Sequence, residues 1–248
     1  MPVVLIHAGV ADRGMWDPIW PELTGDRDVV RLDLRGFGDS AARPAGAVSH
    51  PGDVLDMLSE LGAGRCHLVG ASFGAGVAVE VALARPPAVA SLLLAAPGGS
   101  LLAEMTPDVR AAWDAERTAL ERGDVDAAVE ANLSWWVEGT RRSADQVDPS
   151  VRERVRGMQR RVFEVTADWG DVEEQELDPP ALDRLSEIEV PVLVLVGGLD
   201  LDTVHDAAGR VVAGIAGARR VDWPDAGHLP SLENPAAFAD LLLQWVST

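Results

Sequence analysis

Short apolar, β-branched runs recur along this chain of 248 residues, and helical patterns lie between them. Several runs are continuously apolar, which is typical of strands covered on both faces of a sheet. Strands that alternate with helices predict βαβ units and therefore an α/β fold with a mainly parallel sheet flanked by helices. The predicted strands are Val3–Ile6, Val29–Leu32, His67–Val69, Leu92–Ala95, Val192–Val196 and Arg219–Asp222, and the helical patterns between and after them include Val54–Leu61, Val77–Leu83 and Pro235–Val246.

The alternation stops between Leu101 and Glu187, where no strand pattern is present. Apolar residues there recur at helical spacing, and Arg122-Gly123-Asp124 is typical of a helix end followed by an N-cap. We therefore expect a helical cap at residues 101–187, inserted into a core formed by residues 1–100 and 188–248. The helical segments are Pro107–Arg122, Val125–Val137, Pro149–Phe163 and Pro180–Leu185.

The predicted cap holds half of the eight tryptophans, namely Trp113, Trp135, Trp136 and Trp169. For each of them we favour packing inside the cap over lining a pocket that faces the sheet.

The basic residues number 21 and are all arginine, against 40 acidic residues, so the net charge is −19. This charge disfavours binding to nucleic acid or to anionic membrane surfaces. The absence of lysine excludes a P-loop and Schiff-base chemistry, and the absence of tyrosine leaves acid–base work to His, Asp or Glu. The single cysteine, Cys66, cannot form an intramolecular disulfide and is expected to be a buried strand residue.

The apolar start of the chain is short, lacks basic residues and ends at His7, so it predicts a buried strand instead of a signal peptide. No apolar run approaches the roughly 18 residues that span a bilayer. We therefore expect a cytoplasmic protein. No group of His, Cys, Asp and Glu has the spacing of a metal site, and we expect neither a metal nor a cofactor.

The strongest local signal for chemistry is Gly70-Ala71-Ser72-Phe73-Gly74, which lies between a predicted strand and a helix of small residues. A serine on such a sharp turn projects its hydroxyl away from the sheet, and glycines relieve the crowding around it. The N-terminus of the following helix favours negative charge at the same point. We favour Ser72 as a nucleophile over a glycine-rich packing turn.

A nucleophilic serine requires a base and an acid that orients the base. Among the five histidines, His228 is best placed, because it follows a late strand and precedes the last helix. Asp200 follows the strand Val192–Val196 at its carboxyl end, where open α/β sheets place their sites. Asp202 is the alternative acid. The chain order Ser72, Asp200, His228 fits a serine–acid–histidine arrangement.

The tetrahedral intermediate of acyl transfer requires an oxyanion hole. We expect the backbone N–H of Phe73 as one donor and that of Gly9 as the other, with Val10 as the alternative to Gly9. His7 is expected to be a buried, hydrogen-bonding residue that shapes the same turn.

Five segments spread over almost the whole chain form a set: His7-Ala8-Gly9 with Trp16, the loop from Asp33 to Ser40, Gly70–Gly74, Gly198-Leu199-Asp200, and Gly227–Pro235. Together they resemble the α/β-hydrolase family, with Ala8 where glycine is usual, and most closely its capped esterases and enol-lactone hydrolases. Serine at position 72 differs from the aspartate nucleophile of dehalogenases and epoxide hydrolases. The absence of lysine sets the chain apart from hydroxynitrile lyases that use one.

The resemblance also implies two strands before Val3 for which this sequence has no room. We therefore expect an α/β-hydrolase fold that lacks the first two strands, with Val29–Leu32 at an exposed sheet edge. A shortened sheet, a homodimer that covers the edge, and a start further upstream are the alternatives.

Two charged stretches outside these segments are expected to be solvated. Arg152, Arg156 and Arg160 form one stripe on a helix, which we favour as a surface paired with acids over a patch that steers carboxylates. The acidic run Asp171–Asp178 is expected to be a solvated loop.

These observations predict a cofactor-free serine hydrolase that cleaves an ester, lactone or similar small-molecule acyl substrate. A carbon–carbon bond hydrolase with the same three residues is one alternative. A hydrolase-like receptor with little turnover is the other.

Overall fold

A computed structural model describes residues 1–25, 27–104 and 106–247. Its sheet runs in the order β2-β1-β3-β4-β5-β6, and every neighbouring pair is parallel. The strands are β1 (Val3–Ile6), β2 (Val29–Leu32), β3 (Cys66–Ala71), β4 (Val89–Ala95), β5 (Val192–Gly197) and β6 (Arg219–Trp223). The parallel α/β sheet predicted from the sequence is therefore confirmed. Cys66 is buried in β3.

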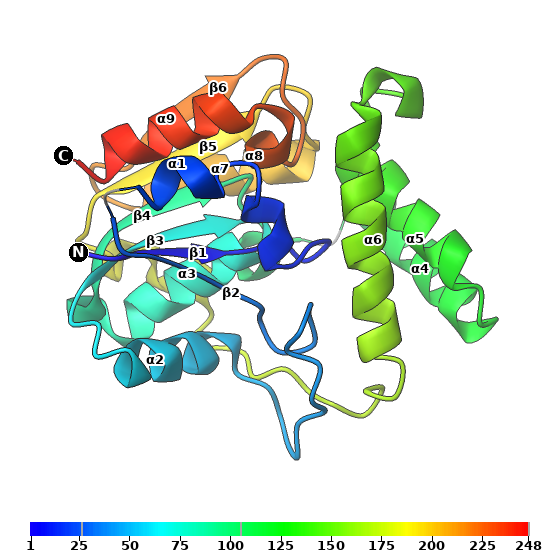
Figure 1. Ribbon diagram of the computed structural model, residues 1–248, viewed down its shortest axis with the longest axis horizontal. Helices are drawn as coiled ribbons and strands as arrows, with labels where there is room; N and C mark the ends of the chain where they lie inside the picture. Colours follow the sequence, from blue (N-terminus) through cyan, green and yellow to red (C-terminus); the bar gives the residue numbers. More distant parts are fainter. Residues whose placement is uncertain (26, 105, 248) are drawn as a thin grey trace.

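Helices cover both faces of this sheet (Figure 1). One face packs against α1 and α9, and the other against α2, α3 and α7. Successive side chains of a strand point to opposite faces, so Val3 and Leu5 join the first core while Val4 and Ile6 join the second. The helices of these layers are α1 (Trp20–Leu23), α2 (His50–Glu60), α3 (Phe73–Ala84), α7 (Asp202–Gly214), α8 (Pro230–Glu233) and α9 (Pro235–Trp245).

Two helices begin earlier than their apolar patterns indicated. Helix α2 starts at His50 because the Ser49 hydroxyl accepts a hydrogen bond from the Gly52 N–H and Pro51 suits the first turn. Helix α3 starts at Phe73, directly after Ser72, and its glycines and alanines hide its beginning from an amphipathic pattern.

The predicted helical insertion lies between β4 and β5, and it stands at the carboxyl ends of the strands (Figure 1). It contains α4 (Pro107–Glu121), α5 (Val125–Asn132), a π-helical stretch (Leu133–Glu138) and α6 (Pro149–Val165). Gly123 adopts a positive φ of 71° and the Asp124 carboxylate accepts from the Ala127 N–H, so the helix end and N-cap lie where the sequence indicated. The segment at Pro180–Leu185 forms a 3₁₀ helix at Ala181–Glu187.

Strand β2 is an edge of the sheet, as predicted, and among the described strands it pairs only with β1. Arg31 of this strand stacks on the Trp20 ring and forms an ion pair with Asp17, so one side of the edge is partly covered. In the described part of the chain, no helix combines the length and apolarity needed to cross a membrane.

Candidate active site

Ser72 occupies the turn between β3 and α3 with a φ of +50°, a backbone region that non-glycine residues rarely adopt. Its N–H donates to the Ala95 carbonyl at 2.8 Å, and its own carbonyl accepts from the Gly98 N–H at 3.1 Å. Neighbouring β4 therefore holds the turn in its strained conformation. A side chain at Gly70 would overlap the backbone of Gly74, which explains the need for glycine there.

His228 and Asp200 complete a hydrogen-bonded row with Ser72. The His228 Nε2 lies 2.8 Å from the Ser72 Oγ, and the His228 Nδ1 lies 3.0 and 3.1 Å from the two Asp200 carboxylate oxygens. A carboxylate only accepts, so Nδ1 carries the proton and Nε2 is free to accept from the serine hydroxyl. Asp200 is 1% exposed and His228 is 4% exposed, which shields both hydrogen bonds from water.

Asp202, the alternative acid, lies outside this row. Its side chain is 88% exposed and pairs with Arg141 at 2.5 Å. Asp202 begins α7, so the two acids diverge where the loop enters the helix. The Asp200 carboxylate stays in the interior, where one oxygen also accepts from the Leu201 N–H at 2.7 Å.

Among the backbone N–H groups near Ser72 that find no acceptor within the described residues are those of Gly9, Val10 and Phe73. Gly9 lies against the Phe73 side chain, so the two turns meet beside the serine. Unpaired N–H groups at this place are what an oxyanion hole needs. The choice between Gly9 and Val10 as the second donor stays a prediction.

His7 is fully buried beneath this turn. Its Nδ1–H donates to the Ala8 carbonyl at 2.9 Å, and its Nε2 accepts from the Leu34 N–H at 3.0 Å. Burial lowers the pKa of His7 to about 4, so the ring is neutral at pH 7. The side chain thus ties the turn after β1 to the chain after β2, the structural role that its position suggested.

Two adjacent arginines of the insertion hold the loops that carry the acid and the histidine. Arg141 donates to the carbonyls of Gly198 and Asp200 at 2.9 and 3.1 Å. Arg142 forms a buried ion pair with Glu233 at 2.6 Å, and Glu233 also accepts from the Gly227 N–H at 3.0 Å. Neither arginine stands out in the sequence, because their partners in these loops lie 57 to 91 residues away.

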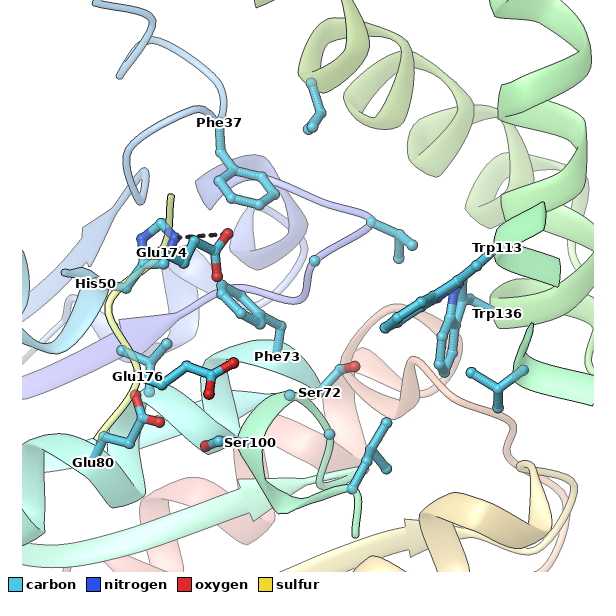
Figure 2. A pocket seen from close by; sticks show the side chains of 18 of the residues that line it. Phe37, His50, Ser72, Phe73, Glu80, Ser100, Trp113, Trp136, Glu174 and Glu176 are labelled. Atoms are coloured by element: carbon cyan, nitrogen blue, oxygen red, sulfur yellow. Dashed lines mark ion pairs between the residues drawn. The ribbon is translucent and has the colours of Figure 1, made fainter. Parts of the chain in front are cut away.

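A cavity of about 850 Å³ opens beside Ser72, between the sheet and the insertion. Figure 2 shows Trp113 and Trp136 on one side of the serine, and Phe37, Phe73 and His50 on the other. The Trp136 ring also lies 5.0 Å from the His228 ring, between centroids.

The four tryptophans of the insertion therefore divide between two environments. Trp113 and Trp136 line the cavity, whereas Trp135 packs beside Ala96 and Leu201, and Trp169 is buried against Gly36. The expectation that these tryptophans pack instead of lining a pocket therefore holds for Trp135 and Trp169 only.

The acidic run Asp171–Asp178 is largely exposed, as expected of a solvated loop, but part of it also lines the cavity. The Val48 N–H donates to the Glu173 carbonyl at 2.8 Å, and this pairing lays the run along the cavity. The side chains of Glu174 and Glu176 consequently line it (Figure 2). No local pattern distinguishes these two glutamates from their neighbours, because a segment more than a hundred residues away positions them.

The arginine stripe on α6 is paired with acids, which is the interpretation we favoured. Arg152 pairs with Glu130 and Glu138, Arg156 pairs with Glu130, and Arg160 pairs with Asp126.

Comparison with known proteins agrees with this fold. A strigolactone esterase of Pisum sativum is 25% identical, over 97% of this chain and 90% of its own. The structure of a thermophilic esterase from Thermogutta terrifontis is 28% identical with a TM-score of 0.77, over 100% of this chain and 89% of its own. The structure of Est816, described as an N-acyl homoserine lactone degrading enzyme, is 25% identical with a TM-score of 0.76, over 98% of this chain and 92% of its own.

The sequence model of the alpha/beta hydrolase family matches residues 3–241, nearly the whole chain. The sheet order, the helical insertion between β4 and β5 and this match lead to one conclusion: the protein is a hydrolase that belongs to the alpha/beta hydrolase family.

Proposed function

We propose that this hydrolase cleaves esters, lactones or similar acyl substrates through an acyl-enzyme formed on Ser72. The observation that carries the proposal is the unbroken row from the Ser72 Oγ through His228 to the buried Asp200 carboxylate. The row opens on a cavity large enough for a small-molecule substrate.

In the proposed reaction, His228 takes the proton of the Ser72 hydroxyl while the oxygen attacks the carbonyl carbon of the substrate. Asp200 holds the imidazole in the required tautomer and stabilises its protonated form. The N–H groups of Phe73 and Gly9 bind the oxyanion. His228 then gives its proton to the leaving group, and water hydrolyses the acyl-enzyme by the same steps in reverse order.

The relatives support this substrate range. The names of the three similar proteins describe two esterases and one enzyme that degrades a lactone. An ester and a lactone present the same carbonyl to a nucleophile, so one site serves both reactions. The shape of the cavity then determines which acyl and alcohol groups enter.

The direct test is hydrolysis of a chromogenic short-chain ester by the unaltered protein and by Ser72→Ala. We expect turnover in the first and none in the second, because the variant has no nucleophile. The far-UV circular dichroism of both proteins controls for folding. Unchanged turnover in Ser72→Ala would contradict the proposed mechanism.

A fluorophosphonate probe separates an enzyme from a receptor with little turnover. An enzyme is labelled at Ser72 and also releases many product molecules per site. Labelling with less than one turnover per site favours the receptor. Product analysis on diketone substrates tests cleavage of carbon–carbon bonds by the same residues.

A further inference from the structure

The charged side chains that line the active-site cavity are almost all acidic. The described lining includes five glutamates and one histidine, but none of the 21 arginines of the chain. The glutamates are Glu80, Glu104, Glu116, Glu174 and Glu176. A carboxylate on the substrate would lose its hydration in this cavity and would be repelled by these glutamates.

Three of these glutamates gather at one end, on the opposite side of Ser72 from Trp113 (Figure 2). Glu80 comes from α3, and Glu174 and Glu176 come from the segment that follows α6. Burial raises the pKa of Glu80, and repulsion from Glu174 and Glu176 adds to the rise. Glu174 lies 3.6 Å from the His50 Nε2, whereas Glu176 has no ion-pair partner among the described residues.

Aromatic rings stand beside these carboxylates. Phe37 and Phe73 stack with their ring centroids 6.3 Å apart, and the rings of His50 and Phe73 are nearly perpendicular with centroids 5.2 Å apart (Figure 2). Carboxylates combined with aromatic faces are the environment in which proteins recognise substituted ammonium groups.

A separate observation on the wall formed by α6 also indicates a ligand that donates hydrogen bonds. Gln159 lines the same cavity and is only 3% exposed. Its Oε1 has no hydrogen-bond partner in the described part of the chain. A buried acceptor without a partner is costly, and an N–H donor of the bound substrate would satisfy it, which a protonated amine supplies and a quaternary ammonium group does not. The described carboxylates, in contrast, do not converge as a set of metal ligands.

We infer that the acyl substrate of this site carries a cationic nitrogen, as a protonated amine or a quaternary ammonium group. The cation lies at the end formed by Glu80, Glu174 and Glu176, and the uncharged part lies toward Trp113 and Trp136. This inference rests on the proposed function, because it places the scissile carbonyl at Ser72 between the two ends.

Substrates matched in shape but not in charge test the inference. One series has butyryl thioesters of thiocholine, of the neutral isostere 3,3-dimethylbutanethiol and of the anion 3-mercaptopropionate. A second series places the charge in the acyl group, as 4-nitrophenyl esters of 4-(trimethylammonio)butyrate and of neutral 5,5-dimethylhexanoate. We expect the cationic member to have a kcat/KM about tenfold above its neutral isostere in at least one series, and the anionic thioester to be the poorest substrate.

Glu176→Gln is the variant that tests the location of the cation. We expect it to lower the ratio of cationic to neutral kcat/KM about threefold or more, because one carboxylate leaves the acidic end. Glu173→Gln is the matched control. It removes the same charge three residues earlier in the same exposed segment, from a side chain that does not line the cavity, and should leave the ratio unchanged.

The outcomes separate the two proposals. Equal kcat/KM for cationic and neutral substrates in both series overturns this inference and leaves the proposed function standing. An equal fall of the ratio in Glu173→Gln and Glu176→Gln also overturns it, because the preference would then come from the net charge of the protein. Failure of the unaltered protein to hydrolyse any of these substrates contradicts the proposed function, and this inference with it.

Discussion

The Asp200 carboxylate is the buried charge on which the proposed site depends. Both its oxygens face the His228 Nδ1–H, and one also accepts from the Leu201 N–H. The imidazolium formed during the proposed reaction would meet this charge where both side chains are shielded from bulk water and the interaction is strong.

We predict that Asp200→Asn lowers kcat by up to ~10⁴, because an amide stabilises the wrong imidazole tautomer and carries no charge. Asp202→Asn is the control two residues away, and its exposed position predicts a change within about threefold. Steady-state kinetics on a neutral ester distinguishes them. A larger loss in Asp202→Asn would show that our assignment of the acid is wrong.

His7 predicts a pH dependence of stability. The pKa of this residue is lowered to about 4 in the folded protein, so between pH 6.5 and about 4 the unfolded chain binds the proton and the folded chain does not. The contribution of His7 to the free energy of unfolding is therefore complete above pH 6.5 and is lost progressively as the pH falls to about 4. The total is about 3 kcal/mol.

The measurement is urea unfolding of the unaltered protein and of His7→Gln between pH 7.5 and about 4.5. The variant retains a donor and an acceptor but does not titrate. We expect the difference in free energy of unfolding between the two proteins to shrink as the pH falls. A difference that is constant over this range contradicts the assignment.

At the scale of elements, the packing of α3 against β1 depends on the absence of a side chain at Gly74. A Cβ there would overlap the carbonyl oxygens of Ile6 and His7. Backbone atoms cannot move aside as a flexible side chain can, so β1 and the start of α3 would have to separate.

We predict that Gly74→Ala destabilises the protein by about 3 kcal/mol or more. Gly157→Ala is the matched control, because Gly157 lies inside α6 with no atom within 4 Å of the added Cβ. Alanine favours the helix there and should stabilise it by about 1 kcal/mol. Chemical unfolding of both variants measures the contrast, and similar effects at the two positions would refute it.

The insertion is joined to the histidine loop by the ion pair of Arg142 and Glu233, both of which are about nine-tenths buried. Arg142→Met should destabilise the protein by about 3–5 kcal/mol, because Glu233 would remain buried without a partner. The double variant Arg142→Met/Glu233→Leu should recover much of this loss, although the Gly227 N–H then loses its acceptor.

Arg160→Met provides the comparison on the surface, where the pair with the exposed Asp126 should contribute less than about 1 kcal/mol. Thermal or urea unfolding of Arg142→Met, of the double variant and of Arg160→Met measures these losses of stability. If Arg142→Met costs no more than Arg160→Met, the buried pair does not join the insertion to the core.

On the scale of the whole molecule, β2 is an edge of the sheet, and no described strand pairs with its outer side. Such edges are liable to pair with another chain. A homodimer that covers this edge is therefore our prediction for the assembly. Sedimentation velocity should show a species of twice the 26.3 kDa chain mass at micromolar concentration. A monomer at every concentration tested would contradict it.

The sequence by itself determined the strands, the helical insertion and the catalytic candidates, because these depend on local patterns. A continuously apolar run such as Val192–Val196 has few alternatives to a strand covered on both faces. Gly70 and Gly74 around Ser72 similarly record a local need for close backbone approach. Asp200 and His228 could be identified from their places after β5 and β6, since parallel strands end at the same edge of the sheet.

Only the tertiary structure decided which side chains surround the substrate cavity. Trp113 and Trp135 are alike in the sequence, but only Trp113 lines the cavity. Glu174 and Glu176 belong to an exposed acidic run, and only the pairing of Val48 with that segment brings them to the cavity. The physical reason is that these contacts join segments distant in the chain. Their partners depend on how the insertion packs over the sheet, and no local periodicity carries that information.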